Sequence, residues 1–366
     1  MVDLFLKQLK KIPLDKQAII FNSEAITYGE LLLKVDHLYN LISKAFGPNK
    51  VVIILGDYSF NSIAILFALC RHNCIFVPII SKNEEEIAKK IEVSNPDYII
   101  DSNSIKIKSF KKQDNNFTNS YYQELFKSNK SGLVLFSSGS TGIPKAMVHD
   151  FDNLISTYNV GKIKNLNFLV FLLFDHIGGL NTMLNILSMG STMVIPGERE
   201  PELIAKLIQK YKVNILPASP TFLNLMNIGG IFESYDLSSL KLITYGTEPM
   251  SESLLNILKM KLPKARLIQT FGTSETGIIK TKSKSSGSLL VKFEDNNQEI
   301  KIVNGELWIK SKTRVLGYIN HDNNSFTKDG WFKTGDLVEQ KEDGYLKIIG
   351  RKSKIINVGG EKVLPI

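Results

Sequence analysis

One segment of this 366-residue chain does most to set its architecture: Ser137-Ser138-Gly139-Ser140-Thr141-Gly142-Ile143-Pro144-Lys145. It directly follows an apolar run, residues 133–136, that is typical of a buried strand. Its two glycines allow backbone geometries closed to other residues, and its three serines and one threonine supply hydroxyl donors. Exposed N–H groups and the charge of Lys145 add to this set. The segment therefore predicts a phosphate-binding loop.

The familiar Walker phosphate loop, G-x-x-x-x-G-K-[ST], does not fit this segment. Gly142 is followed by Ile143 and Pro144 rather than by a lysine, and Lys145 is followed by Ala146. A loop rich in Gly, Ser and Thr is, on its own, more often an ordinary surface loop. The prediction of a phosphate site therefore depends on other parts of the chain.

Five further segments extend the prediction. They are residues 27–31 (TYGEL), 241–250 (KLITYGTEPM), 269–277 (QTFGTSETG), 331–337 (WFKTGDL) and 350–354 (GRKSK). In order and content they resemble, together with the phosphate loop, the motifs of the adenylate-forming superfamily. This superfamily includes acyl-CoA synthetases, luciferases and the adenylation domains of peptide synthetases. The resemblance spans almost the whole chain.

The resemblance implies an α/β fold with two stacked doubly wound α/β subdomains and a small distorted β-barrel. The residues also favour it, because short apolar runs alternate with helix-forming segments, as in a parallel sheet. We expect strands at residues 51–56, 74–80, 97–100, 133–136, 166–174, 214–216 and 242–244. We expect helices at residues 31–42, 59–70, 152–158, 181–189 and 201–210, the first opened by a capping box of Thr27 and Glu30.

The pattern changes after Gly287 to short strands separated by polar turns, which suggests the barrel. These strands are expected at residues 288–293, 299–303, 306–310 and 345–349. We therefore assign residues 1–350 to a large N-terminal adenylation domain, with α/β subdomains at about 1–280 and the barrel at about 281–350. Residues 351–366 are expected to be a hinge and the stub of a small C-terminal domain. The polar residues 102–131 are expected to be a surface connector.

The composition is that of a globular protein, with 43% hydrophobic and 22% charged residues. The net charge of +9 would suit a nucleic-acid partner, but the lysines are scattered without one long basic block. A biased genome composition explains them, with a mild attraction for an anionic nucleotide or a carrier protein as the alternative. We therefore expect no nucleic-acid partner.

We expect neither a signal peptide nor a transmembrane span in these residues. Residues 1–11 are charged and amphipathic, unlike a signal peptide, and the longest apolar runs are too short for a bilayer. The only two cysteines, Cys70 and Cys74, are expected on one helix as buried thiols, because this spacing on a helix is poor disulfide geometry. We therefore expect a reducing cytoplasm and no integral membrane contact.

The resemblance implies a defined reaction. A carboxylate attacks the α-phosphate of ATP to give an acyl-adenylate and pyrophosphate, and the acyl group then passes to coenzyme A. Because two anions must meet, this chemistry needs positive charge, N–H donors and a divalent cation on the phosphates. The implied cofactors are ATP and Mg²⁺, with coenzyme A or the phosphopantetheine of an acyl carrier protein as acceptor.

Most of the implied site residues contact the nucleotide. In the phosphate loop they are Ser137, Ser138, Gly139, Ser140, Thr141, Gly142 and Lys145. On the adenine side they are Gly246, Thr247, Glu248, Pro249, Phe271, Gly272 and Ser274. Phe271 is implied to pack on adenine; its other role is core packing, and both roles can hold. Asp336 is implied to accept the two ribose hydroxyls, which a carboxylate can do, beside Ile348 and Arg351.

Three residues are implied in catalysis: Lys145, Glu275 and His176. Glu275 and Thr141 match positions that help to hold Mg²⁺, a cation that takes oxygen ligands. His176 belongs to residues 174–180 (FDHIGGL), which resemble the acyl-CoA synthetase segment at the mouth of the acid pocket. Asp175 superficially resembles the amine-binding aspartate of amino-acid-activating domains, but an amino-acid substrate is less favoured.

Several positions depart from the family pattern. Ser274 replaces the usual threonine but keeps the hydroxyl, Ser353 stands where the hinge usually has aspartate or lysine, and Asn357 stands where some members have lysine. The small C-terminal domain brings a lysine that stabilises the adenylation transition state, and it is not part of these residues. Because one such contact is worth about a hundredfold or more in rate, we expect this chain alone to be impaired.

Two alternatives to an acid–CoA ligase remain open. One is an adenylation enzyme that loads a carrier protein, since the acceptor side is completed by the small domain. The other is a non-catalytic module that binds nucleotide and acyl group, which predicts tight binding without turnover.

Overall fold

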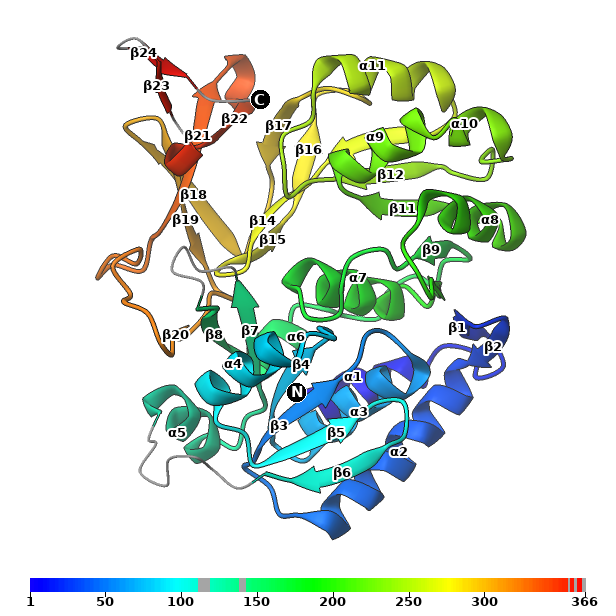
Figure 1. Cartoon of the computed structure of the whole chain (residues 1–366), viewed down its shortest axis with the longest axis vertical. Helices are drawn as coiled ribbons and strands as arrows, with labels where there is room; N and C mark the ends of the chain where they lie inside the picture. Colours follow the sequence, from blue (N-terminus) through cyan, green and yellow to red (C-terminus); the bar gives the residue numbers. More distant parts are fainter. Residues whose placement is uncertain (111–118, 138–142, 355, 359–360, 364–366) are drawn as a thin grey trace. The chain divides into compact units, whose positions relative to one another are not determined.

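The computed structural model of the chain (Figure 1) describes all residues except 111–118, 138–142, 355, 359–360 and 364–366. The chain divides into two compact units, which we describe separately. Unit 1 comprises residues 1–165, 172–195 and 315–323, and unit 2 comprises residues 166–171, 196–314 and 324–366. Both units combine helices and sheets, which confirms the predicted α/β class.

The main sheet of unit 1 has the strand order β20-β8-β7-β4-β3-β5-β6. Its centre is parallel, because β3 pairs in parallel with β4 and β5, and β4 pairs in parallel with β7. These strands are β3 (Val51–Leu55), β4 (Ile75–Ile79), β5 (Tyr98–Asp101) and β7 (Gly132–Ser137). Their apolar side chains are almost all buried, as in a sheet covered on both faces. Antiparallel strands complete the edges: β6 (Lys106–Ser109), β8 (Lys145–Asp150) and β20 (Gly317–Tyr318).

Unit 1 also contains helices with clear starting signals. The predicted capping box is confirmed, because the backbone N–H of Glu30 donates to Thr27 Oγ1 (3.1 Å) and that of Thr27 donates to Glu30 Oε2 (2.7 Å). The helices are α1 (Val2–Leu9), α2 (Tyr28–Ala45), α3 (Phe60–Arg71), α4 (Glu84–Ser94), α5 (Ser120–Lys127), α6 (Phe151–Ile155) and α7 (Ile177–Ser188). A smaller group of strands pairs β1 (Gln17–Phe21) with β2 (Glu24–Thr27) and β10 (Thr192–Ile195).

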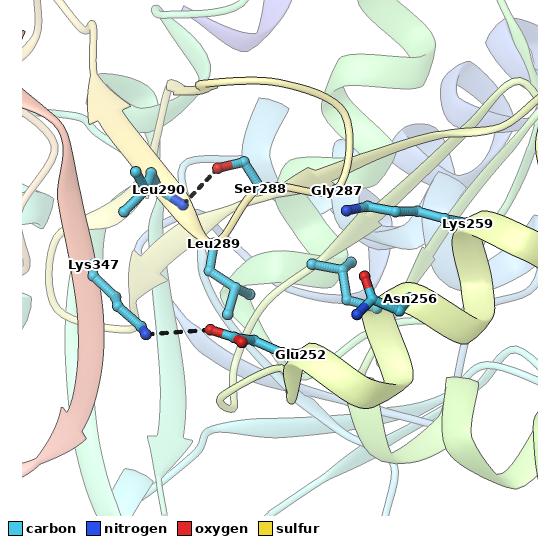
Figure 2. Close-up of a pocket in the computed structure, with 9 residues that line it drawn as sticks. Glu252, Asn256, Lys259, Gly287, Ser288, Leu289, Leu290 and Lys347 are labelled. Atoms are coloured by element: carbon cyan, nitrogen blue, oxygen red, sulfur yellow. Dashed lines mark hydrogen bonds and ion pairs between the residues drawn. The ribbon is translucent and has the colours of Figure 1, made fainter.

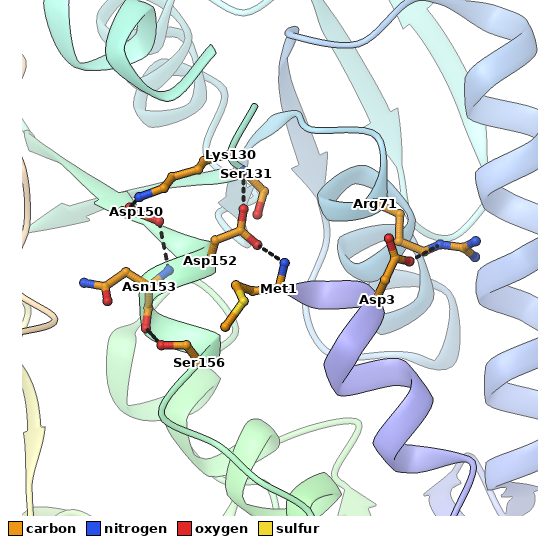
Figure 3. A network of polar contacts seen from close by, with 9 residues as sticks. All are labelled: Met1, Asp3, Arg71, Lys130, Ser131, Asp150, Asp152, Asn153 and Ser156. Atoms are coloured by element: carbon orange, nitrogen blue, oxygen red, sulfur yellow. Dashed lines mark hydrogen bonds and ion pairs between the residues drawn. The ribbon is translucent and has the colours of Figure 1, made fainter. Parts of the chain in front are cut away.

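A polar network fixes the start of α6 in unit 1 (Figure 3). Asp150 caps the helix by accepting from the backbone N–H of Asn153 (2.8 Å), and its other oxygen lies 2.6 Å from Lys130 Nζ. The neighbouring Asp152 accepts from the backbone N–H of Ser131 (3.0 Å) and lies 3.3 Å from the amino group of Met1. The network therefore ties α1 and α6 to the start of β7.

The two cysteines do not share a helix, which corrects the prediction. Helix α3 ends at Arg71, His72 is its C-cap, and Asn73 takes a left-handed conformation with φ of 52°. Such a residue stops a helix, so Cys74 lies just before β4. Both cysteines are buried free thiols, as expected, and burial raises the pKa of Cys74 to about 12.

Two other expectations were wrong. The supposed connector 102–131 contains β6 and α5, because Asn119 caps a helix whose Tyr122 and Leu125 are buried. The long strand expected at 166–174 is only β9 (Asn167–Leu169). The chain leaves unit 2 at this point, and Phe174 packs in unit 1 on Tyr58, with ring centroids 4.8 Å apart.

Unit 2 contains parallel strands and a curled antiparallel sheet. Strand β11 (Ile215–Ala218) pairs in parallel with β9 and β12 (Leu242–Tyr245), which pairs with β13 (Arg266–Gln269). The helices of this layer are α8 (Pro201–Tyr211), α9 (Pro220–Ile228), α10 (Ile231–Ser234) and α11 (Glu252–Lys261). A hairpin follows, formed by β14 (Phe271–Thr273) and β15 (Gly277–Ile279).

Unit 2 also contains a curled sheet with the order β16-β17-β22-β21-β19-β18. It lies where the sequence predicted a small distorted β-barrel, and it forms half of a barrel. Its strands are β16 (Thr281–Ser283), β17 (Leu290–Phe293), β18 (Gln298–Val303), β19 (Glu306–Ser311), β21 (Phe332–Gln340) and β22 (Leu346–Arg351). Short 3₁₀ turns are η1 (Glu342–Gly344) and η2 (Lys352–Lys354), and a last hairpin pairs β23 (Ile356–Val358) with β24 (Glu361–Val363). Leu307, Ile309 and Val338 belong to the hydrophobic core of the curled sheet.

Candidate functional site

The ends of the phosphate loop are positioned by an antiparallel strand pair in unit 1. Ser137 at the end of β7 lies opposite Lys145 at the start of β8. Asn320, which sequence reasoning missed, brackets this lysine: its amide accepts from the backbone N–H of Ala146 (3.0 Å) and donates to the carbonyl of Pro144 (2.9 Å). Ser138, Gly139, Ser140, Thr141 and Gly142 lie outside the described residues, so their roles remain predictions.

His176 lies at the start of α7, in unit 1. It is the N-cap residue, but its side chain does not cap the helix and is 56% exposed. Its Nε2 lies 3.7 Å from the Oδ1 atom of the buried Asp175. The close approach of Gly179 to the carbonyl of Leu173 fixes this turn, because a Cβ at residue 179 would overlap that oxygen. The structure therefore holds an exposed imidazole on a tightly packed turn.

A buried lysine supports the same turn, and sequence reasoning missed it. Lys90 Nζ lies 3.6 Å from Asp175 Oδ2, 2.7 Å from Glu86 Oε1 and 5.6 Å from the ring centre of Phe136. A charge this buried needs such partners. Asp175 therefore faces a cation of the fold itself, the ammonium group of Lys90. In sequence, Lys90 is one polar residue of an amphipathic helix and gives no signal.

The adenine-side residues follow β12 in unit 2. Gly246 packs closely on Thr270, since a Cβ there would lie 2.8 Å from the Thr270 carbonyl oxygen. Thr247 adopts a left-handed conformation with φ of 71°, and Pro249 is exposed. Glu248 accepts from the hydroxyl (2.6 Å) and the backbone N–H (3.2 Å) of Thr221, so its carboxylate supports the first turn of α9. These contacts hold the turn against α9 and Thr270, and contact with adenine remains a prediction.

The hairpin β14–β15 of unit 2 carries the next predicted residues. Phe271 is buried and packs edge-to-face on Phe293, with ring centroids 5.5 Å apart, so its core role is confirmed. Gly272 has no room for a side chain, because a Cβ would lie 2.8 Å from the carbonyl oxygen of Gly277. Ser274 and Glu275 are half-buried at the tip of this hairpin.

The hairpin tip is held by hydroxyl groups on either side of Glu275. Thr273 and Thr276 place their hydroxyl oxygens 2.9 Å apart, and the hydroxyl of Ser311 donates to the carbonyl of Thr276 (2.9 Å). No group of three or more His, Cys, Asp or Glu suited to a metal occurs in the described part of the chain. Mg²⁺ beside phosphates needs only one or two protein carboxylates, so Glu275 fits such a role.

Asp336 and Arg351 form a pair in unit 2, and the carboxylate of Glu275 acts on Asp336 electrostatically. Asp336 on β21 is 7% exposed and lies opposite Arg351 on β22, whose Nε donates to Asp336 Oδ1 (3.1 Å). Burial raises the pKa of Asp336 above its usual value, although Arg351 and Thr334 lower it, and the nearby Glu275 carboxylate adds to the rise. Ile348, also on β22, packs half-buried against the core of this sheet.

A separate surface pocket in unit 2 contains none of the predicted site residues. Glu252 and Lys347 face each other in this pocket (Figure 2). The cavity has a volume of about 330 Å³, and the charged atoms of these two residues lie 3.5 Å apart. Lys259 and Leu289 also line it. The geometry that matches the motifs is therefore the Asp336–Arg351–Glu275 group, not this cavity.

Among the helices in the described ranges, none is long and apolar enough to cross a bilayer.

With this geometry established, comparisons with known proteins define the class. The family model described as AMP-binding enzyme matches residues 5–319, so the chain belongs to the family of AMP-binding enzymes. It is 26% identical over 398 residues to 4-coumarate–CoA ligase-like 9 of Arabidopsis thaliana, covering 94% of this chain and 70% of that protein. It is 33% identical over 269 residues to probable 4-coumarate–CoA ligase 2 of Dictyostelium discoideum, covering 64% and 47%. The matched part spans about half the length of several curated relatives.

A solved structure supports the fold. The anthranilate CoA ligase AuaEII in complex with anthranoyl-AMP superposes with a TM-score of 0.81, covering 100% of this chain and 79% of that one. The sequence identity is 18%, so this likeness concerns the fold alone. It confirms the large-domain architecture expected from the motifs.

Proposed function

We propose that this chain binds ATP and activates a carboxylic acid as an acyl-adenylate. An oxygen of the substrate carboxylate forms a bond to the α-phosphorus, the bond from that phosphorus to the bridging oxygen breaks, and pyrophosphate leaves. The observation that carries the proposal is the buried Asp336 paired with Arg351, in a chain of the AMP-binding family. The carboxylate of Glu275 acts on this pair electrostatically. Burying a carboxylate costs folding free energy, and carboxylates with a raised pKa occur often at ligand sites.

Each group has a proposed task. Asp336 accepts hydrogen bonds from the ribose hydroxyls, and Arg351 keeps the carboxylate in place. Lys145 and the phosphate loop bind the phosphate oxygens, and Glu275 contributes a ligand for Mg²⁺, which would neutralise phosphate charge when bound. His176, exposed on its rigid turn, faces the acid substrate.

The substrate and acceptor are also proposals. The similar proteins are named 4-coumarate–CoA ligase-like 9, probable 4-coumarate–CoA ligase 2 and anthranilate CoA ligase. These names make aromatic acids the first substrates to test and coenzyme A the first acceptor. Loading of a carrier protein remains the alternative acceptor. We place the protein in a reducing cytoplasm because its two buried cysteines are free thiols.

The test is acid-dependent release of pyrophosphate by the purified chain with ATP, Mg²⁺ and pooled aromatic, short-chain and fatty acids. We expect slow release that Lys145→Ala and Glu275→Ala each reduce by about a hundredfold, the usual effect of losing one transition-state contact. Lys206→Ala and Glu202→Ala are matched controls, because these residues form an exposed ion pair on α8. Saturable ATP binding without release from any pool would contradict the proposal and favour the non-catalytic module.

A further inference from the structure

Glu306 occupies a fixed place beside the ribose-binding candidate Asp336. It is the first residue of β19 and pairs with Val303 of β18 across a two-residue turn, Asn304-Gly305. Both turn residues have positive φ, 52° and 78°, as a tight hairpin of this kind requires. The start of β19 is thereby locked to β18.

The pairing of β19 with β21 is irregular where it meets Asp336. Glu306 lies opposite Leu337, but Trp308 lies opposite Lys333, so the register shifts between these pairs. On β21 three residues, 334–336, face the single residue Leu307 across this irregularity. Such bulges bend a strand and redirect its side chains, and they recur next to active sites. The direction of Asp336 therefore depends on what holds the bulge.

Two side chains hold the bulge. Glu306 Oε1 accepts from the backbone N–H of Gly335 (3.1 Å), a residue with φ of 74°. The hydroxyl of Thr334 accepts from the backbone N–H of Asp336 (3.0 Å) and donates to the carbonyl of Leu307 (2.7 Å). Each of residues 334–336 thus has a hydrogen bond that involves one of these side chains.

The second oxygen of Glu306 faces the segment that follows β22. Glu306 Oε2 lies 3.9 Å from Lys352 Nζ, next to the Arg351 that pairs with Asp336. Lys352 is 68% exposed, and an exposed ion pair at this distance contributes little. The hydrogen bond to Gly335, with the Glu306 side chain only 14% exposed, is the contact that matters.

We propose that Glu306 is a positioning residue for nucleotide binding: its carboxylate oxygen fixes the bulge that directs Asp336 toward the ribose hydroxyls. The proposal rests on the proposed function, because it assumes that Asp336 contacts ribose. It requires an acceptor atom at this position, whereas the negative charge and the pair with Lys352 are dispensable. This distinction separates a positioning role from a general effect on charge.

The experiment measures the affinities of the full chain for ATP, 2′-deoxy-ATP and 3′-deoxy-ATP by calorimetric titration. Wild type is expected to bind ATP about tenfold more tightly than either analogue, because one charge-assisted hydrogen bond is lost in each. Glu306→Ala should bring the ratio of the ATP affinity to the affinity for each analogue close to one. Glu306→Gln, which keeps an acceptor oxygen, and Lys352→Gln should leave this ratio within about twofold of the wild-type value. Glu299→Ala, an exposed glutamate on β18, is the matched control.

The outcomes separate the two proposals. If wild type does not distinguish ATP from the deoxy analogues, or if Asp336→Asn leaves the ratio intact, the ribose role of Asp336 itself is wrong. If Asp336→Asn abolishes the ratio and Glu306→Ala keeps it, only the positioning role is overturned. A merely structural Glu306 would weaken all three nucleotides equally. Thr334→Val, which removes the other side-chain contact to the bulge, provides a second variant should Glu306→Ala fail to fold.

Discussion

His149 is a residue whose protonation the fold opposes. It lies on β8 in unit 1, is 1% exposed, and neither ring nitrogen has a hydrogen-bond partner among the described residues. Burial lowers the pKa of His149 to about 4. In the unfolded chain, a histidine has a pKa of about 6.5. At pH values between the two pKa values, the unfolded chain therefore binds the proton more readily than the folded protein does. The stability contribution of neutral His149 is complete above this range and is lost as the pH falls through it.

Replacing His149 by phenylalanine should remove this dependence. Between about pH 6.5 and 4 the wild type should lose roughly 3 kcal/mol of unfolding free energy through this residue, whereas His149→Phe should lose that much less. Urea unfolding at several pH values measures the difference. His37→Phe, a change at an exposed histidine of α2, is the control. Equal slopes for wild type and His149→Phe would show that the imidazole is hydrated or charged in the fold.

Asp336 should show opposite effects on stability and binding. Its pKa is raised by burial, so the folded protein holds this proton more tightly than the unfolded chain does. Its contribution to stability therefore falls as the pH rises from about 3.8 through the folded pKa. Relative to wild type, Asp336→Asn should gain melting temperature across that window, while its affinity for ATP at neutral pH falls about tenfold. A melting-temperature difference that stays constant or shrinks as the pH rises would contradict this account.

At the residue scale, the sequence predicted those site residues that lie inside recognisable motifs. Asp336 and Arg351 lie in two such motifs, and the structure brings them together. Lys90, Glu306 and Asn320 could not be predicted, because each acts on a segment distant in sequence through a contact that exists only after folding. Single polar residues on an amphipathic helix, a strand end or a loop carry no pattern.

At the element scale, the turn before α7 depends on a close backbone approach. A Cβ at Gly179 would overlap the carbonyl oxygen of Leu173, whereas one at Gly178 would meet only the flexible side chain of Leu172, at 3.2 Å. Gly179→Ala should therefore lower the unfolding free energy by about 1–3 kcal/mol, the cost typical of overpacking. Gly178→Ala is the matched control and should change it by less. Urea unfolding provides the comparison, and equal stabilities would mean that the turn relaxes without cost.

Element predictions succeeded where the signal is local. The capping box of Thr27 and Glu30 lies within four residues, and its hydrogen bonds form as expected. The prediction for residues 166–174 was wrong because the apolar side chains of this run pack in two different units. Hydrophobic periodicity alone cannot distinguish such a run from one long buried strand. Helix α5 was missed because only Tyr122 and Leu125 mark its buried face within a polar segment.

At the scale of the whole molecule, family membership and fold support each other. The curled sheet places β21 beside β22, which brings together two motifs that are separate in sequence. The family match covers residues 5–319, so it does not include Asp336 and Arg351. Their pairing is therefore an observation from the structure that is independent of that match.

The most direct test of the central claim is to detect the acyl-adenylate itself. Stoichiometric protein is mixed with ATP, Mg²⁺ and pooled aromatic, short-chain and fatty acids, quenched, and examined by mass spectrometry, which does not require rapid turnover. The account predicts an acyl-AMP species that needs both ATP and acid. At a fixed early time, its amount should fall about a hundredfold in Glu275→Ala and Lys145→Ala, but not in Glu202→Ala or Lys206→Ala. Saturable ATP binding with no acyl-AMP from any acid would contradict acid activation by this chain.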